Sequence, residues 1–199
     1  MKQLIVCALL CCLLIFSKSA CSQEVIRDLA VRDKDWGIEL EPSNYVLRGY
    51  SIQINRNITK DNCLNIGVYS AALDVPLWAK KGMFLNLQDD ADVRLGFQAA
   101  LVVRYKFKIG QKESRPYVGL IGGWEYFDIS HSTLPDMRIT TFIATPYVGY
   151  EIYYFKQLLY INPQLRGVIF VDPQNNRPGR AETMKTAFLL PAFSLGIKF

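Results

Sequence analysis

One segment of this chain alternates apolar and polar side chains over a length that few folds accommodate. Between Val93 and Ile109, a run of seventeen residues, every second side chain is apolar and most positions between carry basic or amide groups. Successive side chains of a β-strand point to opposite faces, whereas a helix cannot place such a series on one face. The segment therefore predicts one continuous β-strand, far longer than the usual five or six residues.

Seven further segments have a strand-like composition, most of them with the same alternation, and turn residues separate them. They cover residues 36–40, 45–55, 63–73, 116–129, 139–154, 158–171 and 187–199. No segment has the length and pattern of the crossover helix that parallel strands require. We therefore predict an all-β fold, an antiparallel up-and-down barrel of eight strands over residues 36–199.

The connections between these predicted strands differ in length in a regular way. The short ones cover 56–62, 110–115 and 155–157. The connections between them are the long 74–92 and 172–186, the intermediate 130–138, and 41–44, which is short and departs from the trend. Short turns at one end and longer loops at the other are typical of a barrel that crosses an outer membrane.

The more polar face of the strands is still too apolar for a water-exposed surface. It includes Tyr117, Ile121, Phe127, Ile143 and Tyr147, which suit a filled lumen. Aromatic residues recur near the strand ends, as expected of the two interfacial girdles of a membrane barrel. A transmembrane β-barrel is the prediction, and a soluble, lipocalin-like carrier is the alternative.

The N-terminus has the pattern of an export signal. Residues 1–22 contain a basic start, an apolar run and small residues before a cleavage site after Ser22, and lipidation at Cys21 is the alternative. Residues 23–35 are a predicted polar periplasmic lead-in. From Gln23 onward there are 21 basic and 18 acidic side chains, a net charge of +3 without a basic block. This balance argues against nucleic acid as a partner.

The C-terminal residues Phe193, Leu195, Ile197 and Phe199 place apolar groups at every second position and end on an aromatic. The pattern resembles the insertion signal that the barrel assembly machinery recognises. With the signal peptide and eight strands, the chain resembles the small eight-stranded outer-membrane barrels of the OmpA/OmpX type. The resemblance implies a Gram-negative source, an outer-membrane location in contact with lipid, periplasmic termini and long loops facing out.

Alternation directs a set of polar side chains into the lumen. They are Arg94, Gln98, Arg104, Lys106, Glu125, Glu151, Asn162, Gln164 and Arg166. We expect two clusters, Glu125 with Arg94 and Arg166 near the outer end, and Glu151 with Arg104 and Lys106 near the periplasmic end. Eight strands leave room for side chains only, so the clusters are predicted to plug the lumen as ion pairs. A narrow polar path and acid–base catalysis are the alternatives.

Three prolines and one arginine do not fit a regular ladder of strands. Pro146, Pro163 and Pro191 lie inside predicted strands, where each removes a backbone donor, and we expect local bulges there. Arg48 falls on the apolar side of the predicted strand 45–55, and we expect it at the level of the lipid headgroups.

One alternative activity rests on His131, Ser132 and Glu125. A serine hydrolase needs a histidine beside its nucleophile and a carboxylate that orients the histidine. Outer-membrane lipid A deacylases of the PagL type carry a His and a Ser on a strand with a Glu nearby, and the segment resembles them in part. No cofactor is predicted, and no spacing of Cys and His predicts a metal site.

The main expectation is a non-enzymatic outer-membrane protein. We expect it to act structurally, or to contact a host, phage or neighbouring cell through the loops 74–92 and 172–186. A lipid-modifying hydrolase and a soluble carrier are the alternatives.

Overall fold

The structure of the protein is a computed structural model. It describes residues 36–59, 62–88, 90–109, 114–132, 134–154, 158–175 and 183–199. The predicted signal peptide over 1–22 and the lead-in over 23–35 lie outside the described residues.

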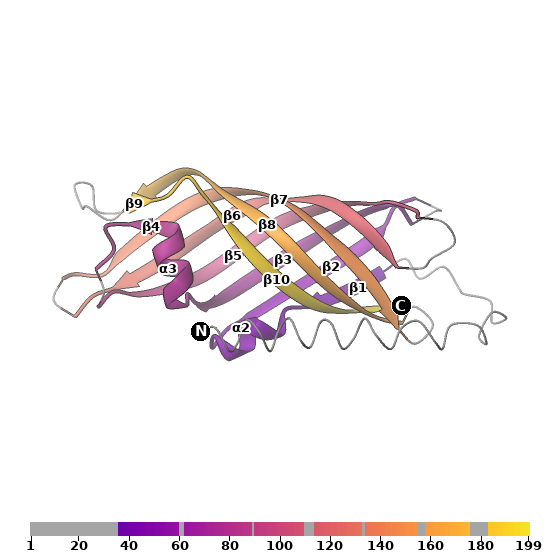
Figure 1. Cartoon of the computed structure of the whole chain (residues 1–199). Coiled ribbons are helices and arrows are strands. Elements are labelled where there is room, and N and C mark those ends of the chain that lie inside the picture. Colours follow the sequence, from indigo (N-terminus) through magenta and orange to yellow (C-terminus); the bar gives the residue numbers. More distant parts are fainter. Residues whose placement is uncertain are drawn as a thin grey trace. The chain divides into compact units, whose positions relative to one another are not determined.

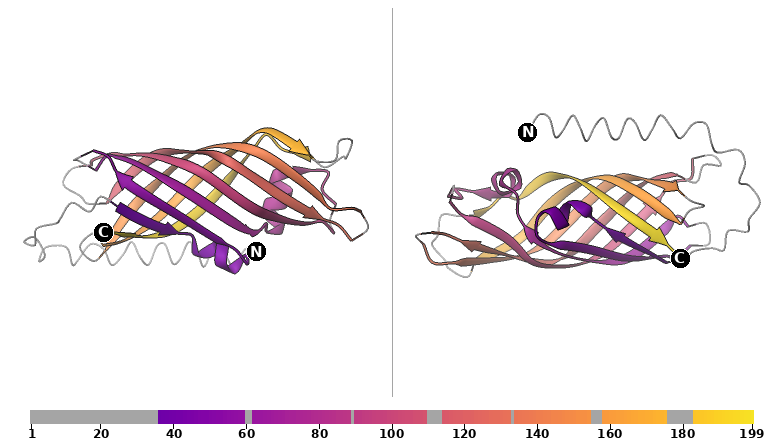
Figure 2. Two further views of the ribbon diagram at one scale, coloured as in Figure 1. Left: turned by 180° about the vertical axis from the view of Figure 1, so that it is seen from behind. Right: turned by 90° about the horizontal axis from the view of Figure 1, so that it is seen from below.

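Eight antiparallel strands form a closed barrel, which confirms the predicted fold class (Figure 1). They are β1 (Trp36–Leu40), β2 (Tyr50–Asn57), β3 (Leu64–Asp74), β5 (Asp92–Lys106), β6 (Arg115–Ser130), β7 (Met137–Tyr154), β8 (Leu159–Asn175) and β10 (Ala187–Lys198). Each strand pairs with its neighbours in the chain, and β1 closes the barrel against β10. The three views show these strands tilted in one sense around the barrel (Figures 1 and 2).

The two ends of the barrel differ, as the connection lengths predict. The turn end carries the connections 58–63, 107–114 and 155–158, and there Trp36 and Phe199 exchange main-chain hydrogen bonds of 3.2 and 3.0 Å. The loop end carries the connections 41–49, 75–91, 131–136 and 176–186. Two short helices and a two-stranded pair lie at the loop end: α2 (Pro42–Val46), α3 (Leu77–Met83), and β4 (Phe84–Leu85) with β9 (Thr183–Met184). Among the described residues, no helix is long and apolar enough to cross a membrane.

The first loop is longer than predicted. Residues 45–49 belong to α2 and the turn after it, and β2 begins only at Tyr50, so the strand predicted over 45–55 is wrong in its first five residues. Pro42 lacks the N–H that a ladder needs and starts α2 instead. Arg48 therefore lies in a turn with a φ of 52°, not on a strand. All four connections at the loop end are therefore longer than a tight turn, and the first connection follows the same trend as the others.

A β-bulge breaks the long alternation of β5. The pairing with β6 shifts between Leu95 and Phe97, where Gly96 is the additional residue. A Cβ at Gly96 would lie 2.1 Å from the ring of Tyr126, so only glycine fits there. Toward the loop end, side-chain directions are reversed: Val93 and Leu95 are buried, and Arg94 points outward. The prediction of one unbroken strand face over 93–109 is therefore wrong for this part.

The three strand prolines cause no bulge, which corrects a second expectation. The ladder between β7 and β8 is interrupted beside Pro146 and Pro163, but its register is the same on either side of each. The β10–β8 ladder continues without a shift past Pro191. Main-chain N–H groups point alternately to the two sides of a strand: on β10 that of Lys198 points to β8, and that of the next residue, Phe199, points to β1. Pro191 is an even number of residues before Phe199, so its nitrogen also faces away from β8 and removes no bond from this ladder.

The outer face of the barrel is apolar between its two ends. Exposed side chains on it include Val68, Leu101, Val118, Leu120, Phe142, Val148, Leu165, Leu189, Leu195 and Ile197. On β6 the outward positions from Pro116 to Tyr126 carry no charge. The ten residue steps from Pro116 to Tyr126 extend about 33 Å along a strand, or about 25 Å along the axis at a tilt of about 40°. That height matches the apolar band of a transmembrane barrel.

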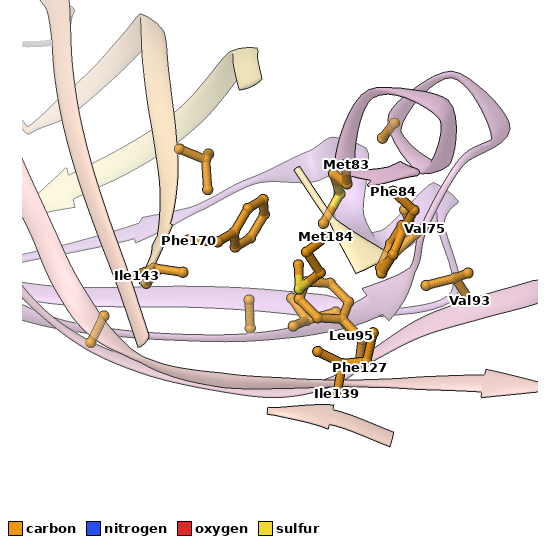
Figure 3. Packing of buried hydrophobic residues seen from close by; sticks show 14 of the residues in the cluster. Val75, Met83, Phe84, Val93, Leu95, Phe127, Ile139, Ile143, Phe170 and Met184 are labelled. Carbon is orange, nitrogen blue, oxygen red and sulfur yellow. The ribbon is translucent and has the colours of Figure 1, made fainter. Parts of the chain in front are cut away.

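An apolar cluster fills the loop-end half of the interior (Figure 3). Met83 and Phe84, at the end of α3, point toward Met184 and Phe127, and the rings of Phe84 and Phe127 meet edge to face at 5.8 Å. The segment with α3 is thereby packed against the apolar interior at the loop end. The other half of the interior is polar.

Candidate functional site: the barrel interior

Glu39 is the centre of the polar interior in the turn-end half. Arg104 donates two hydrogen bonds to it, Nη1 to Oε1 at 2.8 Å and Nη2 to Oε2 at 3.2 Å. Further donors at 2.8–3.1 Å are Tyr160, Asn162, Ser194 and Asn55. Only 2% of the Glu39 side chain and 1% of that of Arg104 are exposed. A buried charge with this many partners is well compensated, which is the arrangement of a structural ion pair.

Glu151 forms the second acidic centre, next to the first. Its Oε1 lies 2.7 Å from Nη1 of Arg104, and its Oε2 lies 3.0 Å from Nζ of Lys106. Tyr153 donates a hydrogen bond to it, and Nζ of Lys198 lies 3.8 Å away. The structure thus places Glu151 with Arg104 and Lys106, the cluster expected near the periplasmic end. Arg104 joins both acidic centres into one network across the lumen.

Tyrosine rings and glycines pack this network tightly. Tyr160 lies over its cross-strand neighbour Gly196, and a Cβ there would be 2.1 Å from the tyrosine Cζ. In the same way, Tyr117 lies over its cross-strand neighbour Gly149, and a Cβ at Gly149 would be 2.2 Å from the hydroxyl oxygen of Tyr117. The Arg104 guanidinium lies 4.5 Å from the centre of the Tyr117 ring. The turn-end half of the lumen is therefore filled by side chains.

The second expected cluster, Glu125 with Arg94 and Arg166, does not form. Arg94 lies outside the barrel with 61% of its side chain exposed and is 3.8 Å from Asp74, because the bulge at Gly96 reverses its direction. Arg166 pairs with Glu41 and donates to Gln164 at 3.3 Å. The sequence prediction missed Glu41 because it assigned residues 41–44 to a short connection.

Glu125 is left without an ionic partner in the part of the chain that the structure describes. It is only 4% exposed, and its Oε1 has no hydrogen-bond partner there. The hydroxyl of Thr145, on the neighbouring strand β7, is equally buried and also has no such partner. Gln98 is opposite Glu125 in the ladder. A buried polar group without a partner is destabilising, so this is the part of the interior that the fold leaves chemically incomplete.

These groups line a cavity of about 200 Å³. Its walls are mainly apolar and include Leu95, Phe127, Ile143, Val168, Phe170 and Leu190. Its polar lining comprises Glu125, Thr145, Gln98 and the Glu41–Arg166 pair, with Ser43 and Asn44 of α2. The cavity lies where the polar half of the interior meets the apolar half.

The sequence prediction also missed the polar residues of the first and last strands. Glu39 lies between Ile38 and Leu40 in a strand of five residues, too short for alternation to stand out. Ser194 and Lys198 lie between the apolar residues of β10, so the same alternation could have identified them as inward. The four residues Phe193, Leu195, Ile197 and Phe199 lie on the exposed face.

The residues of the hydrolase alternative are not brought together. Ser132 donates a hydrogen bond to Asp90, which lowers the pKa of that exposed carboxyl. Glu125 is six residues before His131, and most of that segment is extended strand, which separates the two by about 20 Å. A carboxylate must touch the imidazole to orient it. Among the described residues, no group of three or more His, Cys, Asp or Glu side chains could hold a metal ion.

The fold is that of known outer-membrane barrels. Among solved structures, the chain is similar to the N-terminal β-barrel domain of OprF from Pseudomonas aeruginosa, with a TM-score of 0.52 and 16% identity, over 83% of this chain and 98% of that one. It is also similar to Neisserial surface protein A, NspA, with a TM-score of 0.51 and 14% identity, over 82% of this chain and 94% of that one. No protein-family model matches the sequence, and no curated protein matches it significantly. At these identities the likeness shows the fold.

Proposed function

We propose that this chain is a non-enzymatic barrel of a Gram-negative outer membrane, plugged along its lumen and functional through its loop end. The observation that carries the proposal is the uncharged outer band of about 25 Å on β6, flanked by charged pairs such as Asp128–Arg138 at the loop end. Soluble monomers rarely expose a continuous apolar surface of this extent. Aromatic residues at its edges, Tyr105 toward the turn end and Trp124 toward the loop end, fit the interfaces.

The interior supports a plugged barrel rather than a pore. The Glu39–Arg104–Glu151 network spans the lumen in the turn-end half, and the segment with α3 fills the mouth at the loop end. Eight-stranded barrels have an interior just wide enough to be filled by side chains. We expect no ion conductance when the protein is inserted into a planar lipid bilayer.

Cell fractionation followed by gel electrophoresis tests the location. A closed membrane barrel resists SDS until it is heated, so boiled and unboiled samples from the outer-membrane fraction should migrate differently. A protein that stays in the soluble extract and has one mobility contradicts the proposal and favours the lipocalin-like carrier.

The loops 74–92 and 172–186 are the proposed contact surface for a cell or phage. Strands β4 and β9 pair Phe84 with Met184, and the main-chain N–H of Lys185 donates to the carbonyl of Met83 at 2.7 Å. The described parts of the two loops therefore lie side by side. Replacing residues 172–186 by a Gly-Ser linker should abolish capture of vesicle-borne protein by cultured epithelial cells, while replacing 131–136 should not. Equal capture by both variants, each still heat-modifiable, contradicts this role.

A further inference from the structure

The wall of the barrel is incomplete on one side of its loop-end half. β10 pairs with β8 from Ala187 to Ile197, but β1 ends at Leu40 and pairs with β10 only from Leu195 to Lys198. From Ala187 to Ser194, β10 therefore has a strand on one side only. The helices α2 and α3 lie next to this part of β10 (Figure 1).

Pro191 lies at the centre of this open edge. Its nitrogen faces the unpaired side of β10, as the alternating directions of the Lys198 and Phe199 N–H groups require. An unpaired N–H next to hydrocarbon is strongly unfavourable, and proline has none. Pro191 therefore leaves no main-chain donor without an acceptor at its position on the unpaired side of β10.

The cavity reaches the surface at this edge. Its lining includes the exposed residues Ser43 of α2, Trp78 of α3 and Pro191 of β10. From there it extends to Glu125 on β6 and Thr145 on β7, and β8 lies between β7 and β10 in the sheet. A molecule that enters beside β10 therefore meets a mainly apolar lining with the Glu41–Arg166 pair and, on β6 and β7, the two polar groups Glu125 and Thr145.

We propose that this cavity binds a small amphiphilic amine, a hydrocarbon group of about eight carbon atoms with one primary ammonium. A cavity of about 150 Å³ with apolar walls binds benzene, so about 200 Å³ holds a hydrocarbon somewhat larger. The ammonium lies beside the Glu125 carboxyl group, in a lining that also includes Thr145. The hydrocarbon lies against Phe127, Val168 and Phe170.

The charges inside the barrel favour a cation at this position. Among the described residues, the buried carboxylic acids and the buried lysines and arginines number four each: Glu39, Glu41, Glu125, Glu151, Arg104, Lys106, Arg166 and Lys198. Arg104 and Lys106 pair with Glu151, and Arg166 pairs with Glu41. Glu125 alone among these acids has no basic partner among the described residues, so a bound ammonium supplies the positive charge that would stabilise its ionised form in this buried position.

Binding of n-octylamine to the barrel in lipid nanodiscs tests the proposal. The chain has three tryptophans, so Trp36→Phe and Trp124→Phe leave Trp78, at the cavity mouth, as the fluorescent reporter. We expect saturable binding of octylamine above that of empty nanodiscs, and at least tenfold weaker binding of octan-1-ol and octanoate. Glu125→Gln should weaken octylamine binding at least tenfold and leave octan-1-ol binding unchanged.

Two control variants separate the site from general effects. Asp128→Asn removes a carboxylate on the outside and should leave octylamine binding unchanged. Ala192→Phe fills the cavity beside β10 and should abolish binding of both the amine and the alcohol.

Three results would overturn the proposal: no saturable binding, equal binding of amine and alcohol in wild type and Glu125→Gln, or a preference for octanoate. A heat-dependent gel shift of each variant shows that the barrel is folded in the same nanodiscs. The proposed outer-membrane location is contradicted by a different result, namely a wild-type protein that stays in the soluble extract and shows no heat-dependent gel shift.

Discussion

Arg104 and Glu39 form a bidentate ion pair across the barrel, between β5 and β1, strands that are not neighbours in the sheet. The two residues are 65 positions apart in the chain. Because β2 and β3 lie between these two strands, the pair bridges the lumen and can form only once this part of the sheet is curled. It therefore links the curvature of the sheet to the filling of the interior.

Removing one partner of this pair should strongly destabilise the barrel. Glu39→Gln keeps the shape of the side chain but removes one of the two carboxylates that pair with the buried Arg104 guanidinium and leaves it with Glu151 alone. Breaking a buried pair in this way costs about 3–5 kcal/mol. The free energy of unfolding by urea, measured in lipid vesicles, checks this value. Asp128→Asn breaks the exposed pair with Arg138 and should change it by less than about 1 kcal/mol. Equal effects of both substitutions would contradict the structural role of Glu39.

A methyl group at Gly196 should be poorly tolerated. Its Cβ would lie 2.1 Å from the ring of Tyr160, which is held in place by its hydrogen bond to Glu39. Overpacking of this kind destabilises by about 1–3 kcal/mol. Gly167→Ala on β8 is the matched control, because the nearest atom to its Cβ lies 3.7 Å away. Urea unfolding of the two variants should differ accordingly, and equal stability would show that Tyr160 can move aside.

An arginine at Leu101 distinguishes a membrane barrel from a soluble one. Leu101 is 64% exposed and lies midway along the outer band of β5. In a bilayer, Leu101→Arg should destabilise by about 2–4 kcal/mol, whereas Leu159→Arg near the turn end should change stability by about 0–1 kcal/mol. Unfolding in vesicles compares the two variants. On a water-exposed surface both would stay within about 0.5 kcal/mol, and that outcome would refute the membrane assignment.

Phe84 should stabilise the loop-end segments around α3 and β9, whereas the barrel itself should fold without it. Phe84→Ala removes a buried ring that packs on Phe127 and leaves a void at the mouth. Trypsin should then cleave faster at Lys80, Lys81 and Lys185 around α3 and β9, while the heat-dependent gel shift persists. Leu77→Ala, at an exposed position of the same helix, is the control and should cleave at the wild-type rate. Loss of the gel shift in Phe84→Ala would mean that these segments and the barrel fold as one unit.

Much of the architecture follows from local pattern. Alternation with a period of two is a property of each strand by itself, so it predicts the strands, their inner and outer faces, and their number without knowledge of pairing. For Arg104, Lys106, Glu151 and Asn162 it also predicts the inward direction, which the structure shows. The connection lengths likewise predict which end carries the loops.

Tertiary structure decided the rest. Where the alternation reverses depends on the bulge at Gly96, whose position is set by the pairing of β5 with β6, and this turned Arg94 outward. Which groups meet Glu39 and Glu41 depends partly on closure. Arg166, the base of Glu41, lies on β8, and so do two of the donors to Glu39, and β8 comes next to the first strand only when β1 joins β10. Because Arg94 points outward and Arg166 pairs with Glu41, Glu125 is left without a base among the described residues. Side-chain direction is local along a strand, whereas contact across a lumen depends on how all eight strands are arranged around it.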